Sequence, residues 1–486
     1  MIRRIFFHAR SSNRCRWQGW SIVAAGLESQ GHRVRGSDIV EMPDLQETIV
    51  GDLGDFDLVR RAAEGVDAIV HLGGNPGTRP WPEIRNNNYV GCYNVFEAAR
   101  ELGIRRIAFS SRAGLLSSYP GGLQRTIDML PRPNSLYDIS KTFGEALGYM
   151  YSSRFDMEAV SVRIGNFNPD RDLPEHPHQL SHGDCVRVFT AAITHPGVKY
   201  EAVFGVSDSD WAMYDLDHGR REIGYEPQDV SHVAVADRKT DVEDDLPALP
   251  WRPPERILIT GAGGNIGRVV AAGLSERYQI RGVDRVAMPD LPDHIVGDVA
   301  DPGLCARAME GVDAVIHLAG VPSGGSPFEE VMACNFDGTF QMMDAASRAG
   351  VCRFVFASRA GLLGPYGRKN QRTNAMYPLP DSYYSISKVF GEGLGHMYAN
   401  RHNMSFVSAR IGNFKPDRPT PEHPHQLGHA DAVHLFERAI LQPDVRYEVV
   451  FGVSASDWPL YDMDQARQAI GYEPQQVSHV AEANRE

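Results

Sequence analysis

The strongest constraint on the fold of this chain is a long internal repeat. The segment RIGNFNPDRDLPEHPHQL begins at Arg163, and RIGNFKPDRPTPEHPHQL begins at Arg410, 247 positions later. The segments SLYDISKTFGE and SYYSISKVFGE, which contain Tyr137 and Tyr384, repeat with the same spacing. Solenoid units recur every ~20–50 residues, so a repeat of this length predicts a duplicated domain.

The duplication predicts two domains, 1–235 and 256–486, each of about 230 residues and therefore large enough for a core of its own. The stretch 236–255 between them reads ADRKTDVEDDLPALPWRPPE. Its charges and prolines are typical of an extended linker.

The composition is that of a globular protein and excludes several functional classes. Hydrophobic residues make up 42% of the 486 positions and charged residues 23%, which excludes a wholly disordered chain. The chain has 49 Lys and Arg against 62 Asp and Glu, a formal net charge of −13, which argues against nucleic-acid binding. We find neither an apolar run of ~18 residues nor a signal-peptide pattern, so no membrane association and a cytoplasmic location are expected.

The second half opens with the pattern of a dinucleotide-binding unit. Residues 256–260, RILIT, are an apolar run that predicts a buried strand, and a glycine-rich segment then leads into the helical pattern RVVAAGLSERY. In such a unit the first glycine makes a tight turn, the second lets the backbone approach a pyrophosphate, and the third lets helix and strand pack. The residues expected at the pyrophosphate are Gly261, Gly264, Asn265, Ile266 and Gly267.

An acidic residue stands where such units bind ribose. Asp284 ends a second strand, QIRGVD, 23 positions after Gly261, where a carboxylate hydrogen-bonds the ribose hydroxyls and disfavours a 2′-phosphate. Arg285 follows and would tolerate a phosphate, so the sequence favours NAD over NADP. Further strands, HIVGD ending at Asp298 and AVIHLAG at 314–320, alternate with helical stretches. The prediction is an α/β protein made of two tandem Rossmann-like domains, each a doubly wound parallel sheet.

These motifs together resemble the extended short-chain dehydrogenase/reductase family, also called the NAD-dependent epimerase/dehydratase family. Within it, FASRAGLLGPYG, SISKVFGE, RIGNF and FGVSASDW are most similar to uronate dehydrogenases. The resemblance implies an NAD-dependent enzyme and covers nearly all of both halves. It also implies further contacts to the cofactor from Asp298, Leu318, Ala319, Gly320, Asn335 and Lys388.

Tyr384 and Lys388 are the expected catalytic pair. They lie one helical turn apart and so face the same side of a helix. A phenol with a pKa near ~10 is a poor base at neutral pH, but a neighbouring ammonium and the nicotinamide charge are expected to lower that pKa. The phenolate would then take a proton from a substrate hydroxyl while hydride leaves for NAD.

The residue that polarises the reacting oxygen is left open between two candidates. Members of the family place a catalytic Ser or Thr three residues beyond the aromatic residue of this strand, which here is Phe356. That position is Arg359, and Ser358 lies one residue early. Either Ser358 acts through a shifted backbone, or Arg359 acts as the electrophile or clamps an anion through two parallel hydrogen bonds.

The substrate region also departs from the uronate dehydrogenases, which carry an arginine for the sugar carboxylate about twelve residues after the arginine of RIG. No arginine stands there in this chain, so the carboxylate partner would be Arg359, Arg418 or a histidine, or the substrate is not a uronate. The histidines of EHPHQL allow a metal reading, but we expect substrate-binding or structural roles and no metal site. The expected substrate-binding residues are Ser323, Arg359, His423 and His425.

The first half is predicted to be a partner domain without NAD. After its first strand at Arg4–Phe7, HARSSNRCRWQGWSIVAAG replaces the glycine loop, and the bulky Arg14, Arg16, Trp17 and Trp20 would obstruct a pyrophosphate. The alternative is that these arginines bind another phosphate-bearing ligand. Because family members commonly dimerise through the helix with the catalytic Tyr and Lys, the resemblance implies an intramolecular pseudo-dimer of the two halves.

The sequence therefore predicts an NAD-dependent oxidoreductase acting on a sugar-like, acidic substrate, with uronate oxidation to an aldarolactone as the simplest form. Two alternatives stay open. One is an epimerase, dehydratase or lyase that keeps and recycles NAD. The other is a cofactor-binding scaffold without catalysis.

Overall fold

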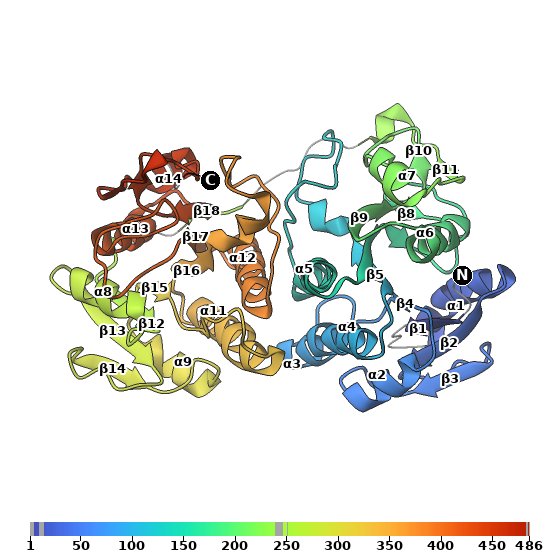
Figure 1. Ribbon diagram of the computed structural model, residues 1–486, viewed down its shortest axis with the longest axis horizontal. Coiled ribbons are helices and arrows are strands. Elements are labelled where there is room, and N and C mark those ends of the chain that lie inside the picture. The colour runs from blue at the N-terminus through green and yellow to red at the C-terminus, as the bar shows by residue number, and fades with distance from the viewer. Residues whose placement is uncertain (1–3, 9–13, 239–245, 250, 483–484, 486) are drawn as a thin grey trace. The chain divides into compact units, whose positions relative to one another are not determined.

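The computed structural model describes residues 4–8, 14–238, 246–249, 251–482 and 485. The chain divides into two compact units, Met1–Asp244 and Asp245–Glu486. Each unit contains one seven-stranded sheet in which all paired strands are parallel, with helices between the strands (Figure 1). The predicted α/β class and the two tandem Rossmann-like domains are confirmed.

In the first unit the strand order is β3-β2-β1-β4-β5-β6-β9. Its sheet strands are β1 (Arg4–His8), β2 (Arg33–Asp38), β3 (Glu47–Val50), β4 (Ala68–His71), β5 (Arg106–Arg112), β6 (Glu158–Ile164) and β9 (Tyr200–Gly205). Its α-helices are α1 (Arg14–Ser29), α2 (Phe56–Ala63), α3 (Trp81–Ile84), α4 (Gly91–Glu101), α5 (Leu136–Phe155), α6 (His182–Thr194) and α7 (Asp217–Ile223). Short strands outside the sheet are β7 (Asn166–Phe167), β8 (Gln179–Leu180), β10 (Asp208–Ser209) and β11 (Val230–Ser231).

The second unit has the same topology, with the order β14-β13-β12-β15-β16-β17-β18. Its sheet strands are β12 (Arg256–Thr260), β13 (Gln279–Asp284), β14 (Asp293–Val296), β15 (Ala314–His317), β16 (Arg353–Arg359), β17 (Ser405–Ile411) and β18 (Tyr447–Gly452). Its α-helices are α8 (Asn265–Leu274), α9 (Pro302–Ala308), α10 (Phe328–Val331), α11 (Gly338–Arg348), α12 (Tyr383–Arg401), α13 (His429–Leu441) and α14 (Asp464–Ile470), and its short strands are β19 (Ala455–Ser456) and β20 (Val477–Ser478).

The predicted strand at 256–260 is β12, and the strand predicted to end at Asp284 is β13. The other two predicted strands end earlier, β14 at Val296 and β15 at His317. The segment 246–249 and the segment 251–255, both within the expected linker, contain no helix or strand, and 239–245 and 250 lie outside the described residues.

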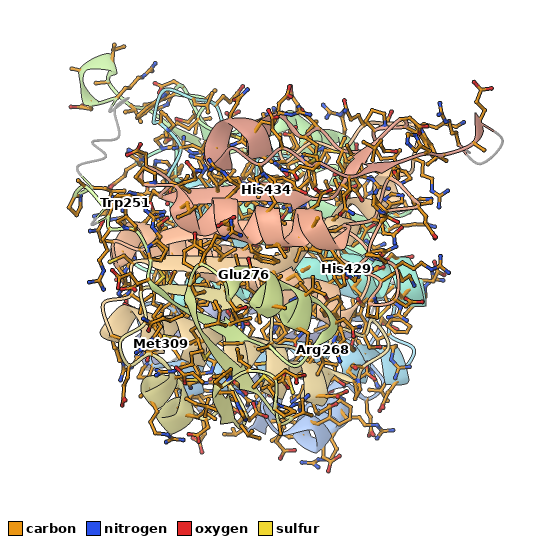
Figure 2. The ribbon with its side chains drawn as sticks, turned by 90° about the vertical axis from the view of Figure 1, so that its left-hand side faces the viewer. Trp251, Arg268, Glu276, Met309, His429 and His434 are labelled. Atoms are coloured by element: carbon orange, nitrogen blue, oxygen red, sulfur yellow. The ribbon has the colours of Figure 1, made fainter. Side chains whose placement is uncertain are left out.

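The central strands of the second unit are apolar because both faces of the sheet are covered. All four residues of β15 are buried, and so are Ile257, Leu258 and Ile259 of β12. Helices α8 and α13 pack together on one face, where the hydroxyl of Tyr278 donates to Glu437 over 3.0 Å. Figure 2 shows the helix with Arg268 beside the helix with His434. Helices α9, α11 and α12 pack in sequence on the other face.

The strand order places the binding crevice. The chain winds outward from β12 through β13 to β14 and then crosses back to β15 on the other side of β12. Ligands of open parallel sheets bind at such a reversal, beyond the carboxyl ends of the strands. None of the helices in the described residues is long and apolar enough to span a membrane.

Candidate active site

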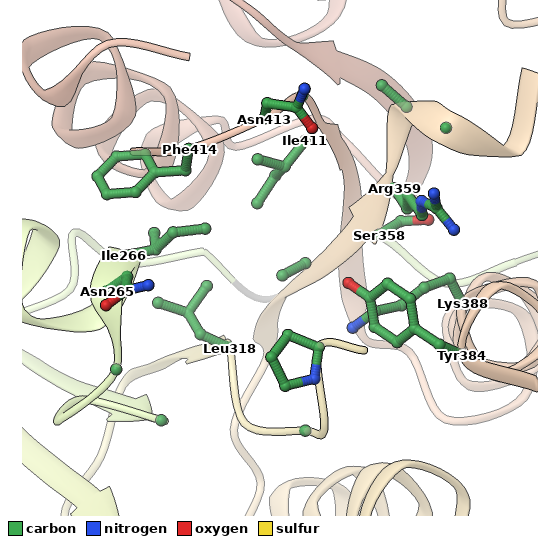
Figure 3. Close-up of a pocket in the computed structure, with 18 of the residues that line it drawn as sticks. Asn265, Ile266, Leu318, Ser358, Arg359, Tyr384, Lys388, Ile411, Asn413 and Phe414 are labelled. Atoms are coloured by element: carbon green, nitrogen blue, oxygen red, sulfur yellow. The ribbon is translucent and has the colours of Figure 1, made fainter. Parts of the chain in front are cut away.

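A cavity of about 1000 Å³ lies at the carboxyl ends of the central strands of the second unit. The loops after β12, β13, β15, β16 and β17 form its wall, together with the start of α12. Figure 3 shows Asn265, Ile266 and Leu318 on one side and Tyr384, Lys388, Ser358 and Arg359 on the other. The cavity therefore joins the glycine loop to the expected catalytic residues. A dinucleotide bound at the loop could thus reach a substrate bound beside those residues.

The glycine loop has the shape that a dinucleotide needs. Gly261 has a φ of +70°, and a Cβ there would lie 2.8 Å from the backbone nitrogen of Ala319. A Cβ on Gly267 would overlap the carbonyl oxygen of Gly261. Helix α8 begins directly after Gly264, so its N-terminus faces the cavity and favours phosphate charge. The expected cofactor residues that line the cavity are Gly261, Gly264, Asn265, Ile266, Gly267, Asp284, Asp298, Leu318, Ala319, Gly320 and Lys388.

Asp284 lies at the end of β13 and is tied to the glycine loop. Its carboxylate accepts the backbone N–H of Gly263 at 2.9 Å and that of Val286 at 3.3 Å. Arg285 also lines the cavity, with Nη1 3.6 Å from the sulfur of Cys334. The carboxylate that would bind ribose therefore also fixes the loop that would bind the pyrophosphate, and the residues present fit NAD.

The close packing of the loop gives a direct test. We expect Gly267→Ala to weaken NAD binding at least about tenfold, because the added methyl group must displace the Gly261 carbonyl and distort the loop. Calorimetric titration with NAD measures this. Gly325→Ala is the control, because a Cβ there meets only Ser323 Oγ, at an ordinary 3.6 Å. Equal affinities of the two variants would contradict the assigned role of the loop.

Tyr384 and Lys388 lie together on α12 and line the cavity (Figure 3). The helix starts at the N-cap Ser382, whose hydroxyl accepts the N–H of Ser385 at 3.3 Å. Lys388 Nζ lies 5.2 Å from the centroid of the Tyr384 ring and 5.0 Å from that of Phe356. The shared helix face predicted from their spacing agrees with this placement.

The electrostatics of the pair differ from the expectation. Burial raises the pKa of Tyr384 above its ordinary value, and the charge that opposes this is the guanidinium of Arg359 rather than the Lys388 ammonium. Burial, with a smaller effect of Arg359, lowers the pKa of Lys388 to about 8. The expectation that Lys388 lowers the pKa of Tyr384 did not weigh the desolvation of a phenol packed at the base of a cavity.

Ser358 and Arg359, at the end of β16, point in different directions. The buried hydroxyl of Ser358 donates to Glu392 Oε1 at 2.6 Å, and Arg410 donates to the same carboxylate through Nε at 2.9 Å and Nη2 at 2.8 Å. The proton that Ser358 would use to polarise a substrate oxygen is thus held by Glu392. Sequence reasoning did not foresee this network, because its members are far apart in the chain.

Arg359 is held over the tyrosine. Its Nη1 donates to Asp381 at 3.1 Å and to Ser385 Oγ at 2.5 Å, and its guanidinium carbon lies 5.6 Å from the Tyr384 ring centroid. It lines the cavity together with Ser358. Of the two candidates for the polarising residue, Arg359 is the one that lies against the Tyr384 ring, with its Nη1 occupied by Asp381 and Ser385.

Two arginines that the sequence reasoning missed line the far end of the cavity, Arg368 and Arg372. Arg372 Nη1 donates to the hydroxyl of Tyr461 at 2.8 Å, and that hydroxyl hydrogen-bonds His425 Nδ1 at 2.9 Å. Burial and the charges of Arg372, His423 and Arg368 lower the pKa of His425 to about 4. A comparison of the two repeats could have pointed to Arg368, because the corresponding residue of the first half is Gly121 and the arginine therefore occurs only in the second half.

Some of the expected residues are not among those that line the cavity. Asn335 is buried behind the cavity wall. Its side-chain oxygen accepts the N–H of Val321 at 2.7 Å, and its side-chain nitrogen donates to the carbonyl oxygen of Val321 at 3.2 Å. Ser323 accepts the N–H of Gly325 at 3.1 Å in an exposed loop. His423 lies outside the lining but stacks on His425, with ring centroids 4.9 Å apart. Arg418 pairs with Glu422 at the surface.

A buried histidine lies beneath the cavity wall. His317 Nδ1 is 2.7 Å from Thr260 Oγ1, and its Nε2 is 3.1 Å from Thr339 Oγ1. Burial, with a smaller effect of Lys388, lowers its pKa from 6.5 to about 3. The folded state therefore holds this ring neutral over a pH range in which the unfolded chain protonates it.

We expect this group to make the protein less stable as the pH falls from about 6.5 towards 3. In that window the unfolded state binds more protons than the folded state, so the free energy of unfolding falls by up to about 1.4 kcal/mol per pH unit for this one histidine. His317→Gln should flatten the dependence, measured by urea unfolding at several pH values. An unchanged slope would contradict the assignment.

No group of three or more His, Cys, Asp or Glu side chains that could hold a metal ion is found among the described residues.

In the first unit, Lys141 Nζ donates to the carbonyl oxygen of Ser110 at 2.8 Å and lies 5.3 Å from the Tyr137 ring. Ser111 donates to Glu145 at 2.5 Å as Ser358 does to Glu392. The backbone of Arg14, Arg16, Trp17 and Trp20 lies in α1, but their side chains, and with them the expected obstruction, lie outside what the structure describes.

A comparison with protein families decides the relationship of both halves. The model of the NAD dependent epimerase/dehydratase family matches residues 18–182 and 257–431. The chain belongs to this family. In the epimerase/dehydratase family the glycine loop follows the first strand, and the match in the first half begins only within α1, whereas the match in the second half begins within β12. The family resemblance inferred from the motifs is thus confirmed.

Two relatives of this chain are named as sugar dehydrogenases. The chain is similar to an NAD-dependent glucose-6-phosphate dehydrogenase of Haloferax volcanii, 38% identical over 247 residues that make up 46% of this chain and 94% of the relative. It is also similar to a uronate dehydrogenase of Pseudomonas syringae, 36% identical over 243 residues, 48% of this chain and 86% of the relative. These relatives identify an enzyme of the NAD-dependent dehydrogenase type.

Among solved structures, a glucuronic acid dehydrogenase from Chromohalobacter salexigens is 33% identical to this chain. The match covers 48% of this chain and 86% of that chain, with a TM-score of 0.44.

Proposed function

We propose that the second half oxidises an acidic sugar with NAD, at a carbon that carries a hydroxyl group. The observation that supports this best is the content of one cavity: a dinucleotide loop at one end, Tyr384 and Lys388 in the middle, and Arg359, Arg368 and Arg372 at the other end. With a uronate the simplest reaction is oxidation of the C1 hemiacetal to an aldarolactone. Relatives named for uronates and for glucose 6-phosphate support an acidic sugar.

The residues that would hold NAD are those of the glycine loop for the pyrophosphate, Asp284 for the adenosine ribose, and Lys388 for the nicotinamide ribose. Asp284 is the reason to propose NAD in preference to NADP. The chemistry that bound NAD supplies is acceptance of a hydride from the carbon that carries the reacting hydroxyl.

The protein moves the proton of the same reaction. Tyr384 Oη takes the hydroxyl proton of the sugar as the carbon–hydrogen bond breaks and the carbon–oxygen double bond forms. Arg359 opposes the rise in the Tyr384 pKa and so stabilises the phenolate, the form of Tyr384 that accepts the proton. Its N–H groups polarise the reacting oxygen. Lys388, at a pKa of about 8, adds a positive charge beside the ring at neutral pH.

The test is production of NADH by the purified chain with a panel of glucuronate, galacturonate, glucose 6-phosphate and glucose. Steady NADH production with an acidic sugar is the expected result. Product without net NADH would instead identify an epimerase, dehydratase or lyase that recycles its cofactor. If no NADH and no other product forms with any sugar of the panel, or with further uronates and sugar phosphates, the proposal is overturned.

We further propose that the first half binds no NAD and packs against the second half as an intramolecular pseudo-dimer. The duplication and the replaced glycine loop support this. Calorimetry is expected to give one NAD per chain, and solution scattering a radius of gyration near ~23 Å, the value for a compact chain of this length. Two NAD per chain, or a much larger radius, would contradict it.

A further inference from the structure

The far end of the cavity is strongly cationic. Among the described residues that line it are Arg368 and Arg372, with Arg359 beside Tyr384, against one carboxylate, that of Asp381. Arg359 is paired with Asp381 over 3.1 Å. The two other acidic residues of the lining, Asp284 and Asp298, belong to the loops at the end where the dinucleotide would bind. This end is therefore built for a ligand with more than one negative charge.

The histidines beside these arginines do not add to the charge at neutral pH. The pKa of His425 lies at about 4, and burial together with the charge of Arg368 lowers the pKa of His423. Both rings are neutral at pH 7 and offer hydrogen bonds only. The positive charge that an anionic ligand meets here comes from guanidinium groups.

The first half provides an internal comparison. Arg125, His178 and Tyr214 correspond to Arg372, His425 and Tyr461. The histidine–tyrosine hydrogen bond is common to both halves, with 2.8 Å between His178 Nδ1 and Tyr214 Oη. Arg125 donates to the carbonyl oxygens of Leu116, Leu123 and Tyr119 and so has a structural role in its loop. Because these three residues occur in both halves, their presence does not distinguish the half that has the cofactor loop from the half that lacks it.

Arg368 does distinguish it. The corresponding residue is Gly121, and the following Lys369 corresponds to Gly122. Of these two added cations, Arg368 lines the cavity and Lys369 does not. The half with the dinucleotide loop thus also has a guanidinium group in its cavity lining where the first half has a glycine.

We propose that the acidic group of the substrate is a phosphate ester, and that Arg368 together with Arg372 forms the subsite that binds it. A phosphate ester carries close to two negative charges at neutral pH, whereas a uronate carboxylate carries one, and the fork of an arginine matches phosphate oxygens. Arg372 holds the hydroxyl of Tyr461 at this end, and Arg368 reaches the ester from the exposed loop after β16. This inference rests on the proposed oxidation of an acidic sugar.

The test compares glucose 6-phosphate with glucuronate and glucose as substrates of the full chain. We expect kcat/KM for glucose 6-phosphate to exceed that for glucuronate at least about tenfold. Arg368→Gly, which installs the residue of the first half, should raise KM for glucose 6-phosphate at least about tenfold with little change in kcat, since a charged hydrogen bond is lost in binding and not in the chemical step. Lys369→Gly is the matched control, and we expect it to leave KM within about twofold.

The outcomes separate this inference from the proposed function. Oxidation of glucuronate as efficient as that of glucose 6-phosphate, or equal effects of Arg368→Gly on both substrates, would overturn the phosphate subsite and leave the dehydrogenase intact. If the chain oxidises no sugar, calorimetric titration with glucose 6-phosphate still decides: weaker binding by Arg368→Gly than by Lys369→Gly supports the subsite, and equal binding overturns it. Arg368→Lys, which keeps a charge, shows whether any loss comes from misfolding.

Discussion

Replacement of Tyr384 by phenylalanine is expected to lower kcat by about 10²–10⁴-fold while the affinity for NAD stays nearly constant. The variant loses only the hydroxyl that takes the substrate proton, and proton transfer by a positioned side chain contributes a factor of this size. The ring stays available for the packing against Arg359 and Lys388. Steady-state production of NADH with a saturating substrate measures the loss, and calorimetry measures the cofactor affinity.

Tyr137→Phe is the matched control, because Tyr137 corresponds to Tyr384 and lies beside a lysine in the same way, 5.3 Å from Lys141 Nζ. We expect kcat to remain within about twofold of the unmodified chain, since the first half lacks the glycine loop. A large loss of activity in Tyr137→Phe, or retention of activity in Tyr384→Phe, would show that the catalytic assignment to the second half is wrong.

Replacement of Glu392 by leucine is expected to destabilise the second unit by about 3–5 kcal/mol. The carboxylate accepts both donors of Arg410 and the hydroxyl of Ser358, and the side chains of Glu392 and Arg410 are only 9% and 2% exposed. Removing the carboxylate leaves a buried guanidinium with no counter-charge. Calorimetric melting of the full chain, in which the two units can unfold separately, gives the shift of the affected transition.

Asp464→Ala is the control for this experiment. Its carboxylate pairs with Arg467 over 2.7 Å at the surface, where the two side chains are 68% and 47% exposed, so its removal should cost less than about 1 kcal/mol. If Glu392→Leu melts within a degree or so of this control, the buried network does not stabilise the unit. Activity of the folded variant would then show separately whether Ser358 needs Glu392 for its position.

The sequence predicted most of the fold and about half of the site. The glycine loop, Asp284 and the pair Tyr384 and Lys388 could be predicted because each is a local pattern, in which spacing along the chain fixes the distance in space. The strand ends at Val296 and His317 differ from the prediction by two and three residues, because the residues that follow each strand leave the sheet and line the cavity.

The rest of the site depends on contacts between distant segments. No local pattern tells that Ser358 donates to Glu392, 34 positions away, or that Arg410, 52 positions from Ser358, donates to the same carboxylate. The same holds for the meeting of Arg372 with Tyr461. The cost of burying a phenol depends on how the whole cavity wall closes over it, and this burial raises the pKa of Tyr384, an effect that the sequence pattern does not contain. Asn335, expected at the cofactor, instead supports Val321 from behind.

The buried trio of serine, glutamate and arginine occurs in both halves. Arg163 and Glu145 pair at 2.9 Å with side chains 0% and 1% exposed, and Ser111 donates to the same carboxylate. The first half keeps this trio although its sequence replaces the glycine loop. The three side chains therefore belong to the common framework of both halves, and a copy without cofactor would still need them in order to fold.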